Sequence, residues 1–327
     1  MSTIARLAML LLFTGLVGPH VAAQTGSSQG YPSKPIKVIV PFGPGGVTDI
    51  MARTVGEKLA ASWGQPVIIE NRPGAGATIG TNIVAKATPD GYTLAVVSSG
   101  HVVNHVFYGT LPYDTIRDFA GVIPLGYNPT FLVVSPALGV KSMKELIALA
   151  RAKPGQLNYV SAGAGSAAHM GVEMFRVAAG IEAVHIPLKS GGEMVTELMS
   201  GRVQFAFMGI GVAGGAMKAG KIIPLATCTA HRAATLPDLP TCAEAGVRGA
   251  EYVFWNGMLA PAKTPREIVA KLNVEIARLI QQPEMRERLA QINIEPLIMT
   301  PEQFDASMRE EFATIGPIMK AAGVKAN

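Results

Sequence analysis

Short runs of β-branched and apolar residues alternate along the chain with stretches that repeat at helical spacing. The first run, Ile36 to Val40, ends at Pro41 and leads through a glycine-rich turn into a helical pattern from Thr48. The same order recurs, and the expected strands cover residues 36–40, 67–70, 92–98, 131–135, 157–161, 183–187, 203–208 and 222–227. Strands that alternate with helices predict an α/β fold, with a mostly parallel sheet flanked by helices.

The last third of the chain has a different pattern. The segment from Thr264 to Glu267, with a proline at its second position, predicts the start of a long helix. Two more helices are expected over residues 283–291 and 301–322. These helices carry most of the charge pairs, which favours a solvated outer layer.

The N-terminal segment has the layout of a secretory signal peptide. Arg6 precedes an apolar run from Leu7 to Val17, and the small residues Val21 to Ala23 follow. The pattern predicts residues 1–23 as a signal peptide that is cut after Ala23, with export to the periplasm. The run is shorter than the roughly 20 residues of a membrane span, and a buried N-terminal helix is the alternative. No later stretch is apolar for long enough to keep the mature protein in a membrane.

Length and composition narrow the class of protein. The 327 residues suggest two domains. Hydrophobic residues make up 49% and charged residues 16%, which excludes a charge-rich coiled coil and a disordered tail. The net charge of +5 comes from scattered residues, so no nucleic-acid partner is expected. In an exported protein, Cys228 and Cys242 either form a disulfide that closes a 15-residue loop or remain two buried thiols.

Glycine loops follow several of the expected strands. In open α/β sheets, ligands bind beyond the carboxyl ends of the strands. The first N–H groups of a helix are unpaired and carry partial positive charge, so two helix starts that face each other form an anion site. The candidate loops are Gly43–Asp49 and Gly163–Ala168. Nearby hydroxyl groups can add donors, and these are Thr48, Ser98, Ser99 and Ser166. The alternative is that Thr48, Asp49 and Ser166 only cap their helices.

Motifs for catalysis, cofactors and metals are absent from the sequence. It contains no GxGxxG, GxxxxGK[ST], GxSxG or HExxH pattern, so no cofactor and no catalytic residue are expected. His101 and His105 have the i, i+4 spacing of a metal pair, but no carboxylate or cysteine lies beside them, so no metal is expected. His169 lies one turn into a glycine-loop helix, where it either hydrogen-bonds a bound carboxylate or has a core or surface role.

Several strings along the chain point to one protein family. They are YPSKPIKVIVPFGPGGVTD at residues 31–49, GQPVIIENRPGAG at 64–76, PDGYTL at 89–94, LNYVSAGAGSAAH at 157–169, LPDLPT at 236–241 and LAPAKTP at 259–265. Together they resemble the Bug family, the periplasmic solute receptors of bacterial tripartite tricarboxylate transporters. The resemblance extends from about Tyr31 to the C-terminus.

The resemblance implies a two-lobed periplasmic binding protein of the Venus flytrap type, in which each lobe is a mostly parallel sheet flanked by helices. Lobe 1 would be discontinuous, with residues 24–129 and 256–327, and lobe 2 would hold residues 130–255. In this family a small carboxylate is held mainly by backbone and hydroxyl groups of loops from both lobes. Carried onto this chain, that implies ligand-binding roles for Phe42, Gly43, Gly46, Thr48, Asp49, Ser98, Ser99, His101, Gly163, Gly165, Ser166, Ala167 and His169.

The chain departs from the family pattern at two places near the expected distal side of the cleft. Met208-Gly209 stands where family members often have an Asp-Asn pair, and Leu188-Lys189-Ser190 stands where they often have Tyr-Lys-Gly. A less polar wall there favours a ligand with one carboxylate and an apolar or aromatic body.

The family resemblance therefore implies a receptor without catalysis. It would act as a monomer and deliver a small organic carboxylate to the subunits of an inner-membrane tripartite tricarboxylate transporter. Two alternatives share the fold. One is a receptor that presents its ligand-bound form to a sensor kinase. The other is an exported α/β hydrolytic enzyme that uses Asp49 and His169 as acid and base.

Overall fold

The structure, a computed structural model, describes residues 30–163, 166–188 and 190–321. The predicted signal peptide, residues 1–23, lies outside the described residues. The described residues from Pro32 onward form one compact unit, which carries both β-sheets. Among the described residues, none of the helices combines the length and the apolar character that a bilayer crossing requires.

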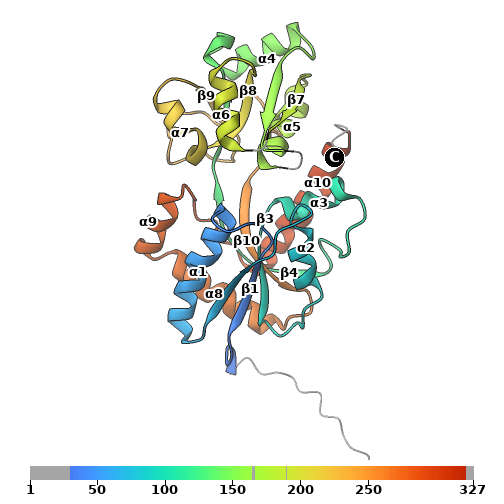
Figure 1. The fold of residues 1–327 in the computed structure, drawn as a ribbon, viewed down its shortest axis with the longest axis vertical. Coiled ribbons are helices and arrows are strands. Elements are labelled where there is room, and N and C mark those ends of the chain that lie inside the picture. The colour runs from blue at the N-terminus through green and yellow to red at the C-terminus, as the bar shows by residue number, and fades with distance from the viewer. Residues whose placement is uncertain (1–29, 164–165, 189, 322–327) are drawn as a thin grey trace, which may run out of the picture. The chain divides into compact units, whose positions relative to one another are not determined.

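The first sheet has five strands in the order β2-β1-β3-β10-β4 (Figure 1). Its strands are β1 (Ile36–Val40), β2 (Val67–Asn71), β3 (Thr93–Ser98), β4 (Phe119–Asn128) and β10 (Phe254–Pro261). The strand β10 runs antiparallel to both of its neighbours, and the other pairs are parallel. The sheet is therefore mostly parallel, as the sequence predicts, with one late strand inserted between β3 and β4.

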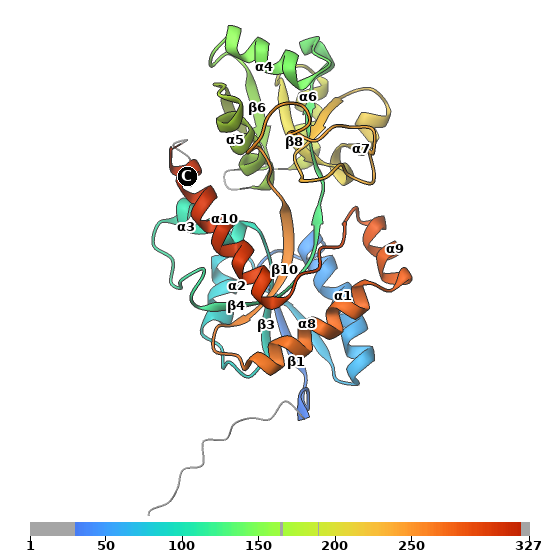
Figure 2. The same cartoon turned by 180° about the vertical axis from the view of Figure 1, so that it is seen from behind.

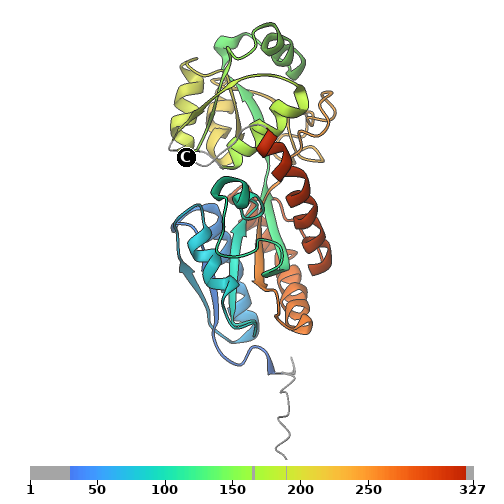
Figure 3. The same cartoon turned by 90° about the vertical axis from the view of Figure 1, so that its right-hand side faces the viewer.

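Helices cover both faces of this sheet. One face packs against α1 (Val47–Trp63) and α8 (Arg266–Ile280). The opposite face packs against α2 (Thr78–Ala85), α3 (Gly100–Tyr108) and α10 (Pro301–Ala321), which share a core with the strands. Figure 2 shows α8 and α10 from behind, and Figure 3 shows α10 in red alongside β4. The short helix α9 (Pro283–Gln291) packs against α8.

The second sheet repeats this design, with the order β7-β6-β8-β5-β9. Its strands are β5 (Thr130–Val134), β6 (Asn158–Ser161), β7 (Val184–Pro187), β8 (Phe205–Gly209) and β9 (Ile223–Thr227). Only β5 runs antiparallel to its neighbours. One face packs against α4 (Met143–Ala152) and α5 (Ala167–Ala179), and the other against α6 (Gly191–Met199) and α7 (Ile210–Lys218).

The chain passes between the two sheets at two places. The strand β4 ends at Asn128 in the first sheet, and β5 begins at Thr130 in the second. The chain returns at Phe254, where β10 enters the first sheet. The first sheet is therefore built from two separate parts of the chain, and the second sheet from one continuous part.

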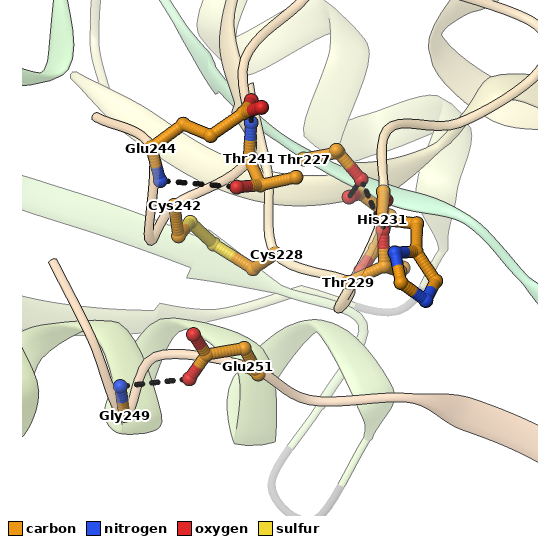
Figure 4. Close-up of a disulfide and its surroundings, with 10 residues drawn as sticks. Thr227, Cys228, Thr229, His231, Thr241, Cys242, Glu244, Gly249 and Glu251 are labelled. Atoms are coloured by element: carbon orange, nitrogen blue, oxygen red, sulfur yellow. Dashed lines mark hydrogen bonds between the residues drawn. A yellow bond between two sulfur atoms is a disulfide. The ribbon is translucent and has the colours of Figure 1, made fainter. Parts of the chain in front are cut away.

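The two cysteines are joined. Cys228 and Cys242 are both fully buried and form a disulfide, with their Cα atoms 4.9 Å apart (Figure 4). The alternative of two free thiols is therefore wrong for this structure. The residues after Cys242 form a series of turns, in which Thr241 Oγ1 accepts a hydrogen bond from Glu244 N at 3.0 Å and Val247 N donates to the Cys242 carbonyl.

Candidate ligand-binding site

A cavity of about 310 Å³ is lined by residues from both sheets, with Phe42 directly before the first glycine loop and Ser166 in the second. It gathers four of the predicted site residues, Phe42, Ser98, His101 and Ser166. Other residues that line it were not predicted from the sequence, and these are Gly76, Ala77, Thr81, Val97, Gly100, Asn104, Tyr108, Tyr252 and Phe254. None of these described lining residues is a lysine, an arginine or a carboxylate.

The first glycine loop, residues 43–46, is fixed by a buried carboxylate. Asp49 is 2% exposed, and its Oδ2 accepts hydrogen bonds from Gly45 N at 2.9 Å and from Arg53 Nε at 3.1 Å. Its Oδ1 accepts from Asn71 Nδ2 at 2.8 Å and pairs with Arg53 at 3.0 Å. Burial alone would raise the pKa of Asp49, but these donors outweigh it and lower the pKa. Asp49 is thus an ionised group that holds the loop in place.

Thr48 begins the same helix and reaches the crossing strand. Its hydroxyl donates a hydrogen bond of 2.6 Å to Asn256 Oδ1 on β10. Asn256 is fully buried, and its Nδ2 has no hydrogen-bond partner within the described chain. A buried amide donor without an acceptor is costly, so this group is suited to bind an oxygen of a ligand or of a water molecule.

The two serines after β3 have different surroundings. Ser98 is 5% exposed and lines the cavity. Ser99 is fully buried, and its hydroxyl is 2.9 Å from the Tyr252 hydroxyl. Its backbone N–H donates to the carbonyl of Trp255. Ser98 therefore faces the cavity, whereas Ser99 ties the start of α3 to the segment that enters β10.

His101 is a core histidine with one edge on the cavity. Its Nε2 lies 3.1 Å from the carbonyl of Thr115, and its ring packs edge-on against Phe119 at 4.9 Å. Burial lowers the pKa of His101 to about 4, so the ring is neutral near pH 7. His105 is bound separately, through Nδ1 to the Val102 carbonyl and by stacking on Phe312. Among the described residues, no group of three or more His, Cys, Asp or Glu side chains could hold a metal ion.

The second glycine loop is held by a hydroxyl and a histidine. Ser161 Oγ accepts from Gly163 N at 3.2 Å and lies 2.7 Å from His185 Nε2. Gly163 has φ of +107°, a conformation that favours glycine. Ser166 caps α5, because its Oγ accepts from His169 N at 3.3 Å. Gly165 lies outside the described residues, and Ala167 is the first residue of α5.

His169 is buried in a stack behind this loop. Its ring lies parallel to that of His185, with centroids 4.0 Å apart, and the Tyr159 ring contacts both, 4.9 Å from His185 and 6.3 Å from His169. Burial, followed by repulsion from His185, lowers the pKa of His169 to about 4. The carboxylate of Glu173 contacts this ring cluster, because it accepts hydrogen bonds from Tyr159 Oη at 2.5 Å and from Arg176 Nη2 at 2.7 Å.

This geometry offers little to acid–base catalysis. Both oxygens of Asp49 already accept two donors, and its pKa is lowered, which weakens it as a base. His169 is enclosed by the aromatic stack of its own sheet. Of the two groups considered for an enzyme, Asp49 is thus occupied in fixing its loop, and His169 is packed within its own sheet.

One feature of the sequence indicates a part of the cavity wall that was not predicted, the part around Gly76 and Ala77. The glycine-rich stretch after β2 places Ala75, Gly76 and Ala77 at positive φ. A Cβ atom at Gly76 would collide with the Tyr108 ring, and Asn104 Nδ2 donates to the Gly76 carbonyl at 2.8 Å. This loop is therefore a third wall of the cavity beside the two predicted ones.

Two mixed α/β sheets with helices on both faces, joined by two crossing segments, define the class of two-lobed periplasmic binding proteins. A solved TctC solute-binding protein from Polaromonas has this fold, with a TM-score of 0.79 at 25% identity over 89% of this chain and 99% of that chain. The model of the tripartite tricarboxylate transporter family receptors, TctC, matches residues 51–324. The chain belongs to this family of periplasmic solute-binding receptors.

Named relatives agree with this assignment. The chain is 34% identical to Protein BugT of Bordetella pertussis over 321 residues, which is 98% of each chain. A solved Rhodopseudomonas palustris protein with adipate, Rpa4515, has a TM-score of 0.76 at 35% identity and covers 91% of this chain and 100% of its own.

Proposed function

We propose that the protein is an exported periplasmic receptor that binds one small organic carboxylate and delivers it to a tripartite tricarboxylate-type transporter. In this proposal residues 1–23 are the signal peptide. Lobe 1 holds residues 24–129 and 256–327, lobe 2 holds residues 130–255, and the receptor is a monomer that does no chemistry on its ligand. The two glycine loops and the residues predicted in them form the site.

The observation that carries the proposal is the chemistry of the cavity. Hydroxyl, amide and backbone groups line it, and the described lining residues include no ionised side chain. Neutral donors together with helix starts hold a carboxylate without the cost of burying a counter-charge. The solved relative named above was obtained with adipate, a carboxylate, which supports this class of ligand.

The apolar part of the cavity favours a ligand with an apolar body. Phe42, Val97, Tyr108 and Phe254 line it beside the polar groups. Among carboxylates, this wall suits a molecule with one carboxylate and an aromatic or aliphatic remainder, because burial of apolar surface stabilises the complex.

A thermal-shift panel on the refolded, signal-free protein tests the proposal. Refolding removes ligand carried through purification, and the panel compares aromatic acids, dicarboxylates, tricarboxylates, acidic amino acids and neutral sugars. A ligand at about 100 times its Kd stabilises the folded protein by about 2.7 kcal/mol. One responsive class of carboxylate, recovered chemically unchanged, supports a receptor; no response to any anion, or conversion to product, contradicts it.

A pair of serine variants localises the site. Ser98→Ala removes a hydroxyl from the cavity wall and is expected to weaken binding of the responsive acid by about tenfold. Ser62→Ala removes a hydroxyl that contacts Glu275 on the surface and should leave affinity unchanged. Equal affinities in both variants would place the acid elsewhere.

A further inference from the structure

A second cavity, of about 800 Å³, has Tyr252 as the one described lining residue that it shares with the candidate ligand site. We call it the back cavity. Its walls come from β4, β10, α10 and the segments around residues 229–231 and 251–253. Its described lining residues include the aromatic rings of Tyr127, His231, Tyr252, Trp255 and Phe304. Such a wall offers both apolar surface and the negative faces of aromatic rings.

The charge of the back cavity is opposite to that of the protein. Glu251, Glu310 and Glu311 line it, and its described lining residues include no lysine or arginine. The chain as a whole has a net charge of +5. Of the described ionisable residues that line it, three are carboxylic acids and one is a histidine, His231. Ionised carboxylates at this place attract a cation.

Glu311 presents an oxygen that has no partner. Its Oε2 accepts a hydrogen bond of 2.8 Å from Trp255 Nε1, whereas its Oε1 is buried and has no hydrogen-bond partner within the described chain. Burial raises the pKa of Glu311 to about 8, against the lowering effect of Trp255. A buried carboxyl oxygen of this kind is costly unless a donor or a positive charge reaches it.

We propose that the back cavity binds a small organic ammonium ion with an apolar or aromatic body. The ammonium group pairs with Glu311 Oε1, and its charge lies against the rings of Trp255 and Tyr252. The apolar body fills the remaining volume, beside Phe304 and Tyr127. The inference goes beyond the proposed carboxylate function and does not rest on it, since Tyr252 is the single residue that both cavities share.

Fluorescence of Trp255 tests the proposal directly. The protein has two tryptophans, so Trp63→Phe leaves Trp255 as the reporter. Titration with benzylammonium is expected to give a saturable change, whereas benzyl alcohol, its neutral analogue, should bind about tenfold more weakly. No saturable change, or equal affinity for the alcohol, would overturn the proposal.

Two glutamate variants locate the charge. Glu311→Gln keeps the shape of the side chain and should weaken benzylammonium binding by about tenfold or more. Glu302→Gln lies on the same helix outside the back cavity and should change nothing. If both variants bind as the parent does, Glu311 is not the partner and the proposal fails.

Proton release gives a test that needs no substitution at Glu311. Since burial raises the pKa of Glu311 to about 8, its carboxyl is expected to be mostly protonated at about pH 7, and pairing with an ammonium ion should release about one proton. Calorimetry of benzylammonium binding in phosphate and in Tris buffer measures this release as a difference in apparent enthalpy. Equal enthalpies in the two buffers would contradict the proposed pairing.

Discussion

In the glycine loop after β1 and in the glycine loop after β6, a side chain binds the backbone N–H of a glycine, but the two side chains differ in charge. Gly45 N donates to the carboxylate of Asp49, which Arg53 and Asn71 also bind. Gly163 N donates to the hydroxyl of Ser161, beside His185. The first loop depends on an ionised carboxylate, and the second depends on a hydroxyl beside a neutral histidine that can be protonated. The two loops should therefore respond differently to substitution and to pH.

The largest expected effect comes from removing the charge of the first loop. Asp49→Ala leaves buried donors without an acceptor and should lower the free energy of unfolding by about 3 kcal/mol. It should also abolish the rise in melting temperature that the carboxylic acid ligand causes in the parent protein, because the Gly45 N–H loses the carboxylate that it binds. Denaturant unfolding measures the first quantity.

A surface carboxylate provides the matched control for that variant. Glu57 forms an exposed ion pair with Arg288, so Glu57→Ala should cost less than about 1 kcal/mol and leave binding intact. If Asp49→Ala binds as well as Glu57→Ala, the loop does not depend on the carboxylate.

The next effect is the response of the second loop to acid. Folding lowers the pKa of His169 from 6.5 to about 4, so the unfolded chain binds a proton more readily than the folded chain. The part of the free energy of unfolding that neutral His169 contributes is present above pH 6.5 and is lost as the pH falls toward 4. At about pH 5, His169 should lower the free energy of unfolding by about 2 kcal/mol. Because the pKa of Asp49 is lowered, its carboxylate stays ionised and continues to hold the first loop at a lower pH than the second loop tolerates.

Hydrogen exchange at single amides distinguishes the acid responses of the two loops, which a measurement of global stability does not. His101 also has its pKa lowered to about 4, so acid unfolding alone does not identify His169. As the pH falls from about 6.5 to 5, the opening free energy of the Gly163 amide should decrease more than that of Gly45, after correction for intrinsic exchange. Equal changes at the two amides would remove the proposed difference.

A smaller effect is expected when the hydroxyl of the second loop is removed. Ser161→Ala deprives Gly163 N of its acceptor and His185 of its partner, and it should cost about 1.5 kcal/mol. Ser200→Ala, which removes an exposed hydroxyl bonded to the Glu197 carbonyl, is the control. Thermal unfolding of both proteins measures the difference, and equal midpoints would show that Ser161 does not secure the loop.

The smallest effect belongs to the exposed partner of Asp49. The Arg53 side chain is 50% exposed, and Gly45 and Asn71 still bind Asp49 without it. Arg53→Ala should therefore cost about 0.5 kcal/mol and preserve ligand binding. A loss as large as that of Asp49→Ala would mean that the ion pair, rather than the carboxylate, fixes the loop.

The sequence predicted the elements that have a clear local pattern. The β-branched run at residues 36–40 is β1, and the pattern at residues 283–291 is α9. The α/β class followed because these patterns alternate over most of the chain. The glycine loops and four residues of the cavity wall could also be indicated, because a loop after a strand and before a helix leaves a local pattern.

Elements whose residues contradict their local preferences were missed. The strand β10 contains Asn256-Gly257, a pair typical of turns, and the structure has a register irregularity there. Gly257 lies against Phe304 of α10, where a Cβ atom would not fit. The strand β4 contains Pro124 and two glycines, which also disfavour a strand assignment. Packing against distant segments decides these strands, and a single sequence does not display such contacts.

The position of β10 also sets an order of assembly during synthesis. The strands of the second sheet all lie between Thr130 and Thr227, so that sheet can form from one continuous stretch. The first sheet cannot close until Pro261 has been made, because β10 joins β3 to β4. A nascent chain that stops earlier presents two unpaired strand edges, which favour aggregation. The N-terminal lobe, although translated first, is thus the last to be completed.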